Sequence, residues 1–454
     1  MRAIDPATGV PQDEHPDHDA HAVEARLAAA KEAFSGFRRT SFAERAAALV
    51  RLADLFVDRK QELAELAAKE MGKPVRQGRA EVEKCALACR FIAENAERFL
   101  ADEVVPTEAR DSRVVHEPLG PILAIMPWNY PYWQIVRGAA SALMAGNVVL
   151  VKPAPGTPGC ALALEALARR AGIPEGVLSV LLVPDDRIGP IIDDPRVAAV
   201  TLTGSPRAGR AVAARAGAAL KKVVLELGGS DPYIVLADAD VELAARTCVS
   251  SRLGNAGQAC IAAKRIIVVP EVRPDFEARV LELVRRVVPG NPLEEATELG
   301  PLARVDLRDL LHRQVAESVK RGARLLLGGE VPERAGAWYP PTMLSDVRPG
   351  MPAFDEELFG PVFAVVPARD EAHAVELANE TEYGLGAAVF TRDVEKGARL
   401  ARTRLDAGLC FVNAAVKSDP RLPFGGVKSS GFGRELGALG IREFVNEKTL
   451  WVGQ

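Results

Sequence analysis

From Gly120 onward the chain alternates between short apolar runs and amphipathic helical stretches, and no other feature restricts its fold as strongly. The first strand-sized runs occupy residues 122–126, 147–151, 177–183, 197–202 and 223–227. Helix-forming segments, such as residues 161–171 and 208–220, separate them. Apolar strands that alternate with helices are typical of a parallel sheet with both faces covered. The pattern predicts an α/β fold.

A second alternation predicts a second lobe. It runs from residue 233 to about 413, with strands expected at 266–269, 362–366, 387–391 and 409–412. The first hundred residues predict helix, with a capping-box spacing at Ser41 and Glu44 and a stop at Gly72. Because 454 residues exceed what one core supports, we expect two doubly wound lobes. The lobes and two extended segments divide as follows: 1–103 with 120–229, then 230–432, with 104–119 and 433–454 extended.

Charge and cysteine content exclude several classes of protein. The net charge is -4 and only 5% of the residues are aromatic, which argues against a nucleic-acid partner. No apolar run approaches the roughly 18 residues of a membrane span, and the first residues, Met1 to Pro6, lack the apolar core of a signal peptide. The six cysteines are scattered, and a chain of this size needs no disulfides. We expect a soluble, cytosolic protein with free thiols.

The turn after residues 197–202 is a candidate nucleotide site. Gly204 suits a tight turn, Ser205 is a good N-cap and Pro206 fits the first helical position. A helix N-terminus at the carboxyl end of a parallel strand is where a pyrophosphate binds. The alternative is a plain strand-to-helix turn. Lys152 ends another predicted strand at the same edge, although taken alone it is a solvated lysine.

Cys260 and Glu226 are the candidate reactive groups. Cys260 lies in a segment of small residues just before the strand predicted at 266–269, where a buried structural cysteine is the alternative. Glu226 lies between two leucines, so burial would raise its pKa and suit a general base. An ion pair of Glu226 with Lys221 or Lys222 is the alternative. No histidine has a motif around it, and the His15, His18 and His21 triplet, interleaved with Pro and Asp, predicts a solvated loop and no metal site.

Five motifs resemble the aldehyde dehydrogenase superfamily, in that family's order and over essentially the full chain. Glu226 and Cys260 lie 34 positions apart, a separation similar to that in other members. Segment 131–138 and the later Asp419-Pro420-Arg421 look most like bacterial succinate-semialdehyde dehydrogenases. The five motifs are Pro127-Trp128-Asn129-Tyr130-Pro131, Leu225-Glu226-Leu227-Gly228-Gly229, Gly257-Gln258-Ala259-Cys260, Glu357-Leu358-Phe359-Gly360-Pro361 and Pro423-Phe424-Gly425-Gly426-Val427-Lys428-Ser429-Ser430-Gly431.

This resemblance implies a role for each matching residue. Cys260 would attack the aldehyde carbon, the Asn129 side chain would hold the oxyanion, and Glu226 would activate the water that hydrolyses the thioester. Lys152 would bind the adenosine ribose, Ser205 the pyrophosphate and Glu357 the nicotinamide ribose of NAD or NADP. The implied cofactor site as a whole comprises Trp128, Lys152, Gly204, Ser205, Leu227, Glu357 and Phe359. Residues 1–103 with 120–229 would bind the cofactor, and residues 230–432 would carry the nucleophile. The extended segments resemble oligomerisation arms, which would pair the tail strand at 448–452 with another subunit in a homodimer or homotetramer.

Two departures from the family pattern affect the cofactor and the substrate. Many NAD-preferring members carry Glu where this chain has Pro155, so we expect NADP to be tolerated. Arg137 follows Asn129 by eight residues, on nearly the same helix face, and would bind a substrate carboxylate. The alternative is an ordinary ion-paired helix residue. Many succinate-semialdehyde dehydrogenases add a second arginine where this chain has Gly254, and Arg421 is the candidate replacement.

The resemblance favours oxidation of succinic semialdehyde to succinate and leaves three alternatives. A general aliphatic or other semialdehyde dehydrogenase would lack the preference for a carboxylate. A thiol esterase would use Cys260 and Glu226 without a cofactor. A CoA-acylating dehydrogenase is disfavoured because Glu226 is present to activate water.

Overall fold

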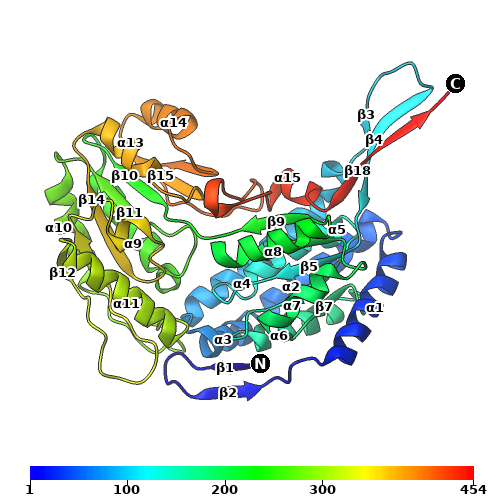
Figure 1. Ribbon diagram of the computed structural model, residues 1–454, viewed down its shortest axis with the longest axis horizontal. Coiled ribbons are helices and arrows are strands. Elements are labelled where there is room, and N and C mark those ends of the chain that lie inside the picture. The colour runs from blue at the N-terminus through cyan, green and yellow to red at the C-terminus, as the bar shows by residue number, and fades with distance from the viewer.

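Two mostly parallel β-sheets, each with its own hydrophobic core, divide the chain into two lobes, and a narrow three-stranded arm projects from one of them (Figure 1). The computed structural model describes all 454 residues. The first lobe is built around a six-stranded sheet and the second around a seven-stranded sheet. No helix is both long enough and apolar enough to cross a bilayer, and all six cysteines are free thiols.

The N-terminal part of the chain is a hairpin followed by four helices. The hairpin and helices are β1 (Arg2–Ile4), β2 (Pro11–Glu14), α1 (Ala20–Phe37), α2 (Phe42–Asp58), α3 (Lys60–Met71) and α4 (Val75–Phe99). Ser41 and Glu44 form the predicted capping box of α2, and Gly72 ends α3 with a left-handed φ of 80°. The polar hairpin was not predicted, because its two short strands carry no apolar alternation.

The first lobe has the strand order β17-β9-β8-β5-β6-β7. All neighbours in this sheet are parallel except β17, which runs antiparallel to β9. Its elements are β5 (Pro121–Ile125), α5 (Trp133–Met144), β6 (Val148–Lys152), α6 (Pro158–Arg170), β7 (Leu178–Val180), η1 (Asp185–Arg187), α7 (Ile188–Asp193), β8 (Ala199–Thr203), α8 (Pro206–Ala218), β9 (Lys222–Glu226), η3 (Lys428–Ser430), β17 (Gly431–Phe432) and α15 (Gly437–Arg442). The five predicted strands of this lobe are thus observed.

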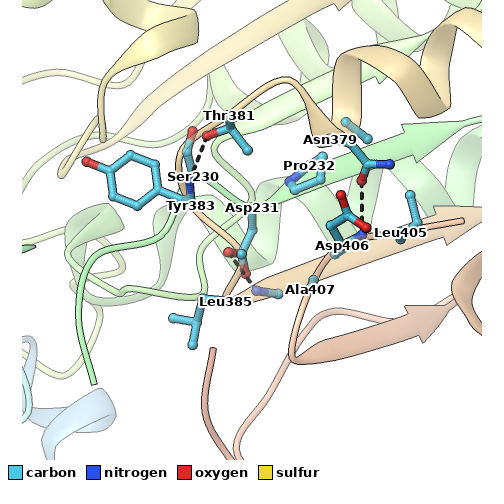
Figure 2. A pocket seen from close by; sticks show the side chains of 14 residues that line it. Ser230, Asp231, Pro232, Asn379, Thr381, Tyr383, Leu385, Leu405, Asp406 and Ala407 are labelled. Atoms are coloured by element: carbon cyan, nitrogen blue, oxygen red, sulfur yellow. Dashed lines mark hydrogen bonds between the residues drawn. The ribbon is translucent and has the colours of Figure 1, made fainter. Parts of the chain in front are cut away.

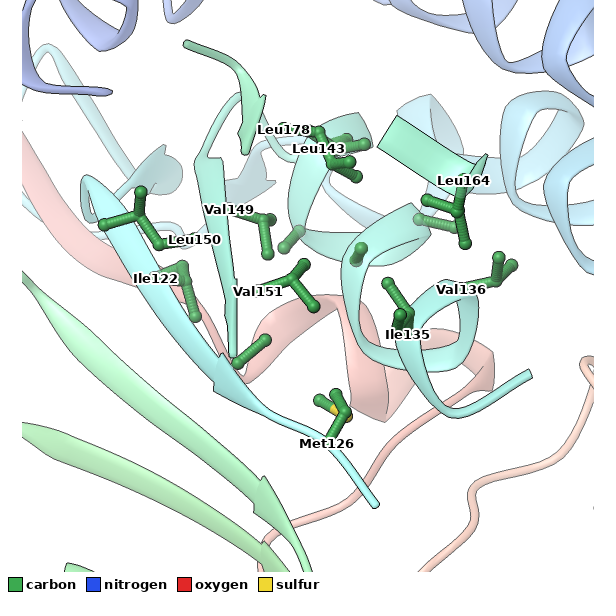
Figure 3. Close-up of a cluster of buried hydrophobic side chains, with 14 of the residues drawn as sticks. Ile122, Met126, Ile135, Val136, Leu143, Val149, Leu150, Val151, Leu164 and Leu178 are labelled. Atoms are coloured by element: carbon green, nitrogen blue, oxygen red, sulfur yellow. The ribbon is translucent and has the colours of Figure 1, made fainter. Parts of the chain in front are cut away.

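Aliphatic side chains fill the space between this sheet and its helices. Ile122, Val149 and Val151 from the central strands meet Ile135 and Leu143 of α5 (Figure 3). Every residue of α5 is buried, polar ones included. Side chains that enter the core from α5 therefore need partners inside the protein.

The second lobe has the strand order β12-β13-β14-β11-β10-β15-β16, in which only β12 is antiparallel to its neighbour. Its elements are β10 (Pro232–Val235), α9 (Val241–Leu253), η2 (Gly254–Gly257), β11 (Arg265–Val268), α10 (Arg273–Val284), α11 (Val305–Lys320), β12 (Arg324–Leu327), β13 (Thr342–Ser345), α12 (Pro352–Asp355), β14 (Val362–Pro367), α13 (Glu371–Asn379), β15 (Gly386–Phe390), α14 (Val394–Thr403) and β16 (Leu409–Val412). The four predicted strands are β11, β14, β15 and β16. The α/β architecture predicted from the sequence is confirmed.

The arm is formed by β3 (Glu103–Val104), β4 (Asp111–Pro118) and the C-terminal β18 (Val445–Val452). Strand β18 pairs with β4 along its whole length, from Val445 opposite Pro118 to Val452 opposite Asp111. The expectation that the tail strand needs a partner from another subunit is therefore wrong, because segments more than three hundred residues apart in the chain meet in the arm.

Candidate active site

A cavity of about 280 Å³ lies where strands β5, β8 and β9 end, facing the loop that precedes β11. Strand β5 lies between β6 and β8, so the connections on its two sides leave toward opposite faces of the sheet, a position where α/β proteins bind ligands. The structure brings eight of the predicted site residues together in its wall: Trp128, Asn129, Gly204, Ser205, Leu227, Cys260, Glu357 and Phe359.

A left-handed stretch of backbone presents the half-buried Cys260 thiol to this cavity. Asn255 and Ala256 have φ of 53° and 54°, and Gly257 has φ of 74°. A Cβ on Gly257 would lie 2.2 Å from the carbonyl oxygen of Gly360, so only glycine fits there. Non-glycine residues in this conformation cost about 1–3 kcal/mol each and occur at functional sites. The surrounding contacts must therefore hold this segment in place.

Amide side chains make those contacts and join the Asn129 loop to the Cys260 loop. Asn129 Nδ2 donates to the carbonyl oxygen of Gln258 at 3.0 Å. Asn255 Nδ2 donates to the carbonyl oxygens of Asn129 and Gln258, at 2.7 and 3.2 Å. One N–H of Asn129 has no recorded partner and is available to an oxyanion. No sequence motif marks Asn255, so its role was not predicted.

Lys264 is a second site residue that no sequence motif predicted. Its buried ammonium donates to the carbonyl oxygens of Ala259 and Cys260, at 2.8 and 2.5 Å, and pairs with Glu357 Oε1 at 3.1 Å. Burial raises the pKa of the Cys260 thiol to about 11, and the positive charges of Arg137 and Lys264 oppose that rise. The thiol is therefore protonated at rest near neutral pH.

Asp231 supports the same loop from behind. Its backbone carbonyl accepts the N–H groups of Lys264 and Arg265, each at 3.2 Å, and its carboxylate accepts the N–H of Gly386 at 3.0 Å (Figure 2). Burial raises the pKa of Asp231 to about 7. Figure 2 shows this carboxylate beside Leu385, in a separate pocket between Ser230 and the segment from Asn379 to Tyr383. Asp231 thus anchors the chain that carries Lys264.

Glu226 ends β9 as a fully enclosed carboxylate. Neither of its carboxylate oxygens has a hydrogen-bond partner, and Oε1 lies against Gly425, where a Cβ would come within 2.8 Å. Burial holds the pKa of Glu226 well above its usual range. Lys221 donates to the carbonyls of Ile192 and Asp194, and Lys222 pairs with Glu443, so neither forms the alternative ion pair. Glu226 is free to act as a base but does not line the cavity.

Arg137 does not line this cavity and contacts a carboxylate of the protein itself. Its guanidinium forms a buried ion pair with Glu435, donates to Thr203 Oγ1 at 3.2 Å, and stacks over Phe424 with 4.5 Å between its Cζ and the ring centre. These contacts correspond to the ion-paired helix residue that was the alternative for Arg137. Its role in binding a substrate carboxylate stays a prediction, and its contacts do not favour it.

The contacts of Arg421 do not favour binding of a substrate carboxylate either. The Arg421 side chain is 72% exposed and forms a two-pronged ion pair with Asp419, at 2.8 and 2.7 Å. The guanidinium therefore faces solvent on the loop before Pro423, and nothing in its contacts supports the predicted replacement of a second arginine.

The residues predicted to bind the nucleotide are arranged in a way that suits such a ligand. The Ser205 hydroxyl caps α8 by accepting the N–H of Ala208, and Pro206 takes the first helical position, as predicted. Phe359 meets Trp128 edge-on, with 5.7 Å between ring centres. A Cβ on Gly228 would lie 2.5 Å from Glu357 Oε2, so glycine at this position lets the carboxylate reach the cavity. A ribose hydroxyl is a suitable ligand for this carboxylate.

Trp128 also lines a second cavity, of about 290 Å³, which Pro155 and Gly156 border. Lys152 lies just before them, at the end of β6, where it is buried and pairs with Asp185. Trp128 is the one residue that lines both cavities.

The class defined by this fold and site is that of thiol-dependent oxidoreductases built from two parallel-sheet lobes. The chain belongs to the aldehyde dehydrogenase family, whose model matches residues 1–450. It is similar to the NAD(P)+ succinate semialdehyde dehydrogenase Sad of Escherichia coli K12, with 47% identity over 99% of this chain and 97% of the relative. It is 46% identical to a probable NADP+ succinate-semialdehyde dehydrogenase of Synechocystis, over 100% of this chain and 99% of that protein. The solved Streptococcus pyogenes succinic semialdehyde dehydrogenase, in complex with NADP+, superposes with a TM-score of 0.97 at 33% identity, each chain covered completely.

Proposed function

We propose that this protein oxidises succinic semialdehyde to succinate with NAD or NADP, through a thioester on Cys260. The observation that carries the proposal is the cavity in which Cys260 and Asn129 face Ser205, Glu357 and Phe359. Relatives of similar length, named as enzymes for this aldehyde, support the choice of substrate.

In this proposal the Cys260 sulfur, once deprotonated, bonds to the aldehyde carbon. The free N–H of Asn129 and the backbone N–H of Cys260 stabilise the resulting oxyanion. A nicotinamide cofactor, when bound, supplies the hydride acceptor that converts this adduct to a thioester. Glu357 orients the ribose, and Lys264 holds both Glu357 and the carbonyl of Cys260.

Glu226 completes the cycle by taking a proton from water, which attacks the thioester carbonyl and releases the carboxylic acid and the thiol. Its raised pKa makes the ionised carboxylate a strong base. Hydrolysis requires the side chain to turn from Gly425 toward Cys260. A cofactor-independent esterase would leave the site formed by Ser205, Glu357 and Phe359 without a use.

We further propose that the arm joins copies of the chain into a homodimer or homotetramer in the cytoplasm. Strand β18 is an edge of its sheet. Trp451 on β18 is 50% exposed and Val104 on β3 is 67% exposed. Open edges and exposed apolar side chains favour pairing with another copy. Light scattering after size exclusion tests the assembly, and a monomer at micromolar concentration would contradict it.

The central test measures kcat/KM for succinic semialdehyde, butanal and a longer aliphatic aldehyde with each cofactor. The proposal expects reduced nicotinamide to form, succinic semialdehyde to be preferred, and NADP to support turnover because Pro155 offers no carboxylate to repel a 2′-phosphate. Equal efficiency on succinic semialdehyde and butanal would make a general aliphatic aldehyde dehydrogenase the better assignment. Activity with NAD alone, at saturating NADP, would contradict the cofactor proposal.

A further inference from the structure

Lys84 is a largely buried cation that no carboxylate of the protein neutralises. It lies on α4, which packs against α5, and it forms no ion pair, since the carboxylate of Glu81 on the same helix pairs with Lys73. Its only recorded hydrogen bond goes to Ser418 Oγ, at 2.5 Å, on the loop before Pro423. Of the three N–H donors of a lysine, two thus have no recorded partner. An unneutralised charge in such a place is costly unless a ligand uses it.

Aromatic and polar groups hold the ammonium of Lys84 beside the active site. It stands 4.2 Å from the ring centre of Trp133, and the next residue, Gln134, lines the cavity that contains Cys260. Gln134 is itself 2% exposed, and its Oε1 has no hydrogen-bond partner. The ammonium of Lys84 and the unpartnered amide of Gln134 thus lie near the first turn of α5, through its adjacent residues Trp133 and Gln134.

The two arginines predicted to bind the substrate are already paired. Arg137 is held by Glu435 and Arg421 by Asp419. Gly254 stands where many succinate-semialdehyde dehydrogenases carry a second arginine, so this chain has no cation at that position. Ala88, one turn after Lys84, lines a small cavity with Arg137 and Pro420, so α4, α5 and the loop with Ser418 converge there. Lys84 is consequently a partly buried positive charge at this junction that has no ion-pair partner.

We propose that Lys84 binds the carboxylate of the aldehyde substrate and makes the enzyme selective for a short aldehyde acid. This inference rests on the proposed function and adds the residue that recognises the far end of the substrate. Two methylene groups separate the carbonyl carbon of succinic semialdehyde from its carboxylate. Lys84 and the Ser418 hydroxyl offer donors to the carboxylate.

The charge of Lys84 changes with pH near pH 8. Burial, and after it the positive charge of Arg137 on α5, lower the pKa of Lys84 to about 8, while Cys85 and Glu81 on α4 and Cys260 on the nucleophile loop oppose the change. Lys84 is thus a cation below about pH 8 and loses its charge above it. The preference for a carboxylated aldehyde should fall as pH rises through this range.

The kinetic test compares kcat/KM for succinic semialdehyde with that for butanal, because the ratio cancels effects on the nucleophile. Lys84→Met keeps the stem over Trp133 and removes the charge, and should lower the ratio about 10- to 100-fold. Lys84→Arg should retain most of the ratio and keep it flat above pH 8. Lys31→Met, on an exposed lysine of α1, is the matched control. An unchanged ratio in Lys84→Met, or its loss in Arg137→Leu alone, would overturn the proposal.

Alkylation of Cys260 tests the charge without catalysis. In the wild type, the ratio of the alkylation rate with anionic iodoacetate to that with neutral iodoacetamide should be higher below pH 8 than above it. Lys84→Met should remove this increase. Cys260→Ala measures the background alkylation. If neither aldehyde is oxidised but the increase in the alkylation ratio depends on Lys84, the proposed function fails and the anion site stands. If succinic semialdehyde is preferred but neither readout responds to Lys84, only the present proposal fails. Should Lys84→Met not fold, the pH dependence of both ratios in the wild type and in Lys84→Arg decides.

Discussion

Arg137 and Glu435 form an ion pair in which the two side chains are only 2% and 3% exposed. Burial raises the pKa of Glu226, the charge of Arg137 partly offsets that rise, and the charge of Glu435 adds to it. The charge of Arg137 therefore stabilises the ionised forms of two buried carboxylates, Glu435 and Glu226, and its removal should raise the pKa of both.

Arg137→Leu should lower the free energy of unfolding by about 3–5 kcal/mol, because it leaves Glu435 charged and buried without a partner. Urea denaturation measures the change. Adding Glu435→Gln should recover part of the loss, since the orphaned charge is then removed. A single-variant loss below about 1 kcal/mol would show that the pair is not the main function of Arg137.

Cys260→Ala should abolish aldehyde oxidation and leave cofactor binding intact, because the thiol acts on the aldehyde. In the wild type, the pKa of about 11 implies that alkylation by iodoacetamide accelerates about tenfold per pH unit from pH 7 to 10. Mass spectrometry of the Cys260 peptide follows the reaction. A rate that is flat over this range would mean that the thiolate already predominates.

Glu226→Gln should still reduce one equivalent of cofactor rapidly and then stall as a thioester, since hydride transfer precedes hydrolysis. Stopped-flow absorbance detects the burst and intact-protein mass the trapped acyl group. A variant with neither would show that Glu226 acts earlier, on the thiol itself.

Glu81 should contribute strongly to the free energy of unfolding. It pairs with the buried Lys73 and accepts the N–H groups of Tyr132 and Trp133, each at 2.9 Å, where α5 begins. Glu81→Ala should lower the free energy of unfolding by about 3–5 kcal/mol. Glu83→Ala, on the same helix and in an exposed pair with Lys60, should cost below about 1 kcal/mol. Similar losses in the two variants would contradict this assignment.

The sequence predicted what local pattern encodes. Apolar runs marked nine strands, and the residues at Ser41, Gly72 and Ser205 marked where helices begin and end. Short motifs placed eight residues that line one cavity. The structure shows them together because several of their strands end at the same sheet edge.

Burial of charge could not be predicted in the same way. Nothing next to Lys73, Lys84 or Lys264 in the chain distinguishes it from a solvated lysine, since the groups around it come from distant segments. One signal was available for Lys84, which occupies the same helical row as the buried Ala88 and Ile92. The hairpin partner of β1 and the pairing of β18 with β4 likewise depend on contacts that no local pattern encodes.

The antiparallel pairing of β17 with β9 makes the second lobe a topological insertion. The chain leaves the first sheet after Glu226 and returns at Gly431, which lies opposite Glu226, and the N–H of Leu227 donates to the carbonyl of Ser430 at 3.0 Å. About two hundred residues thus begin and end within one hydrogen bond of each other. A short turn could replace them without stretching the remaining sheet, so the first lobe is a natural unit to excise and study alone. The same closure places Glu226 at both points where the chain crosses between the lobes.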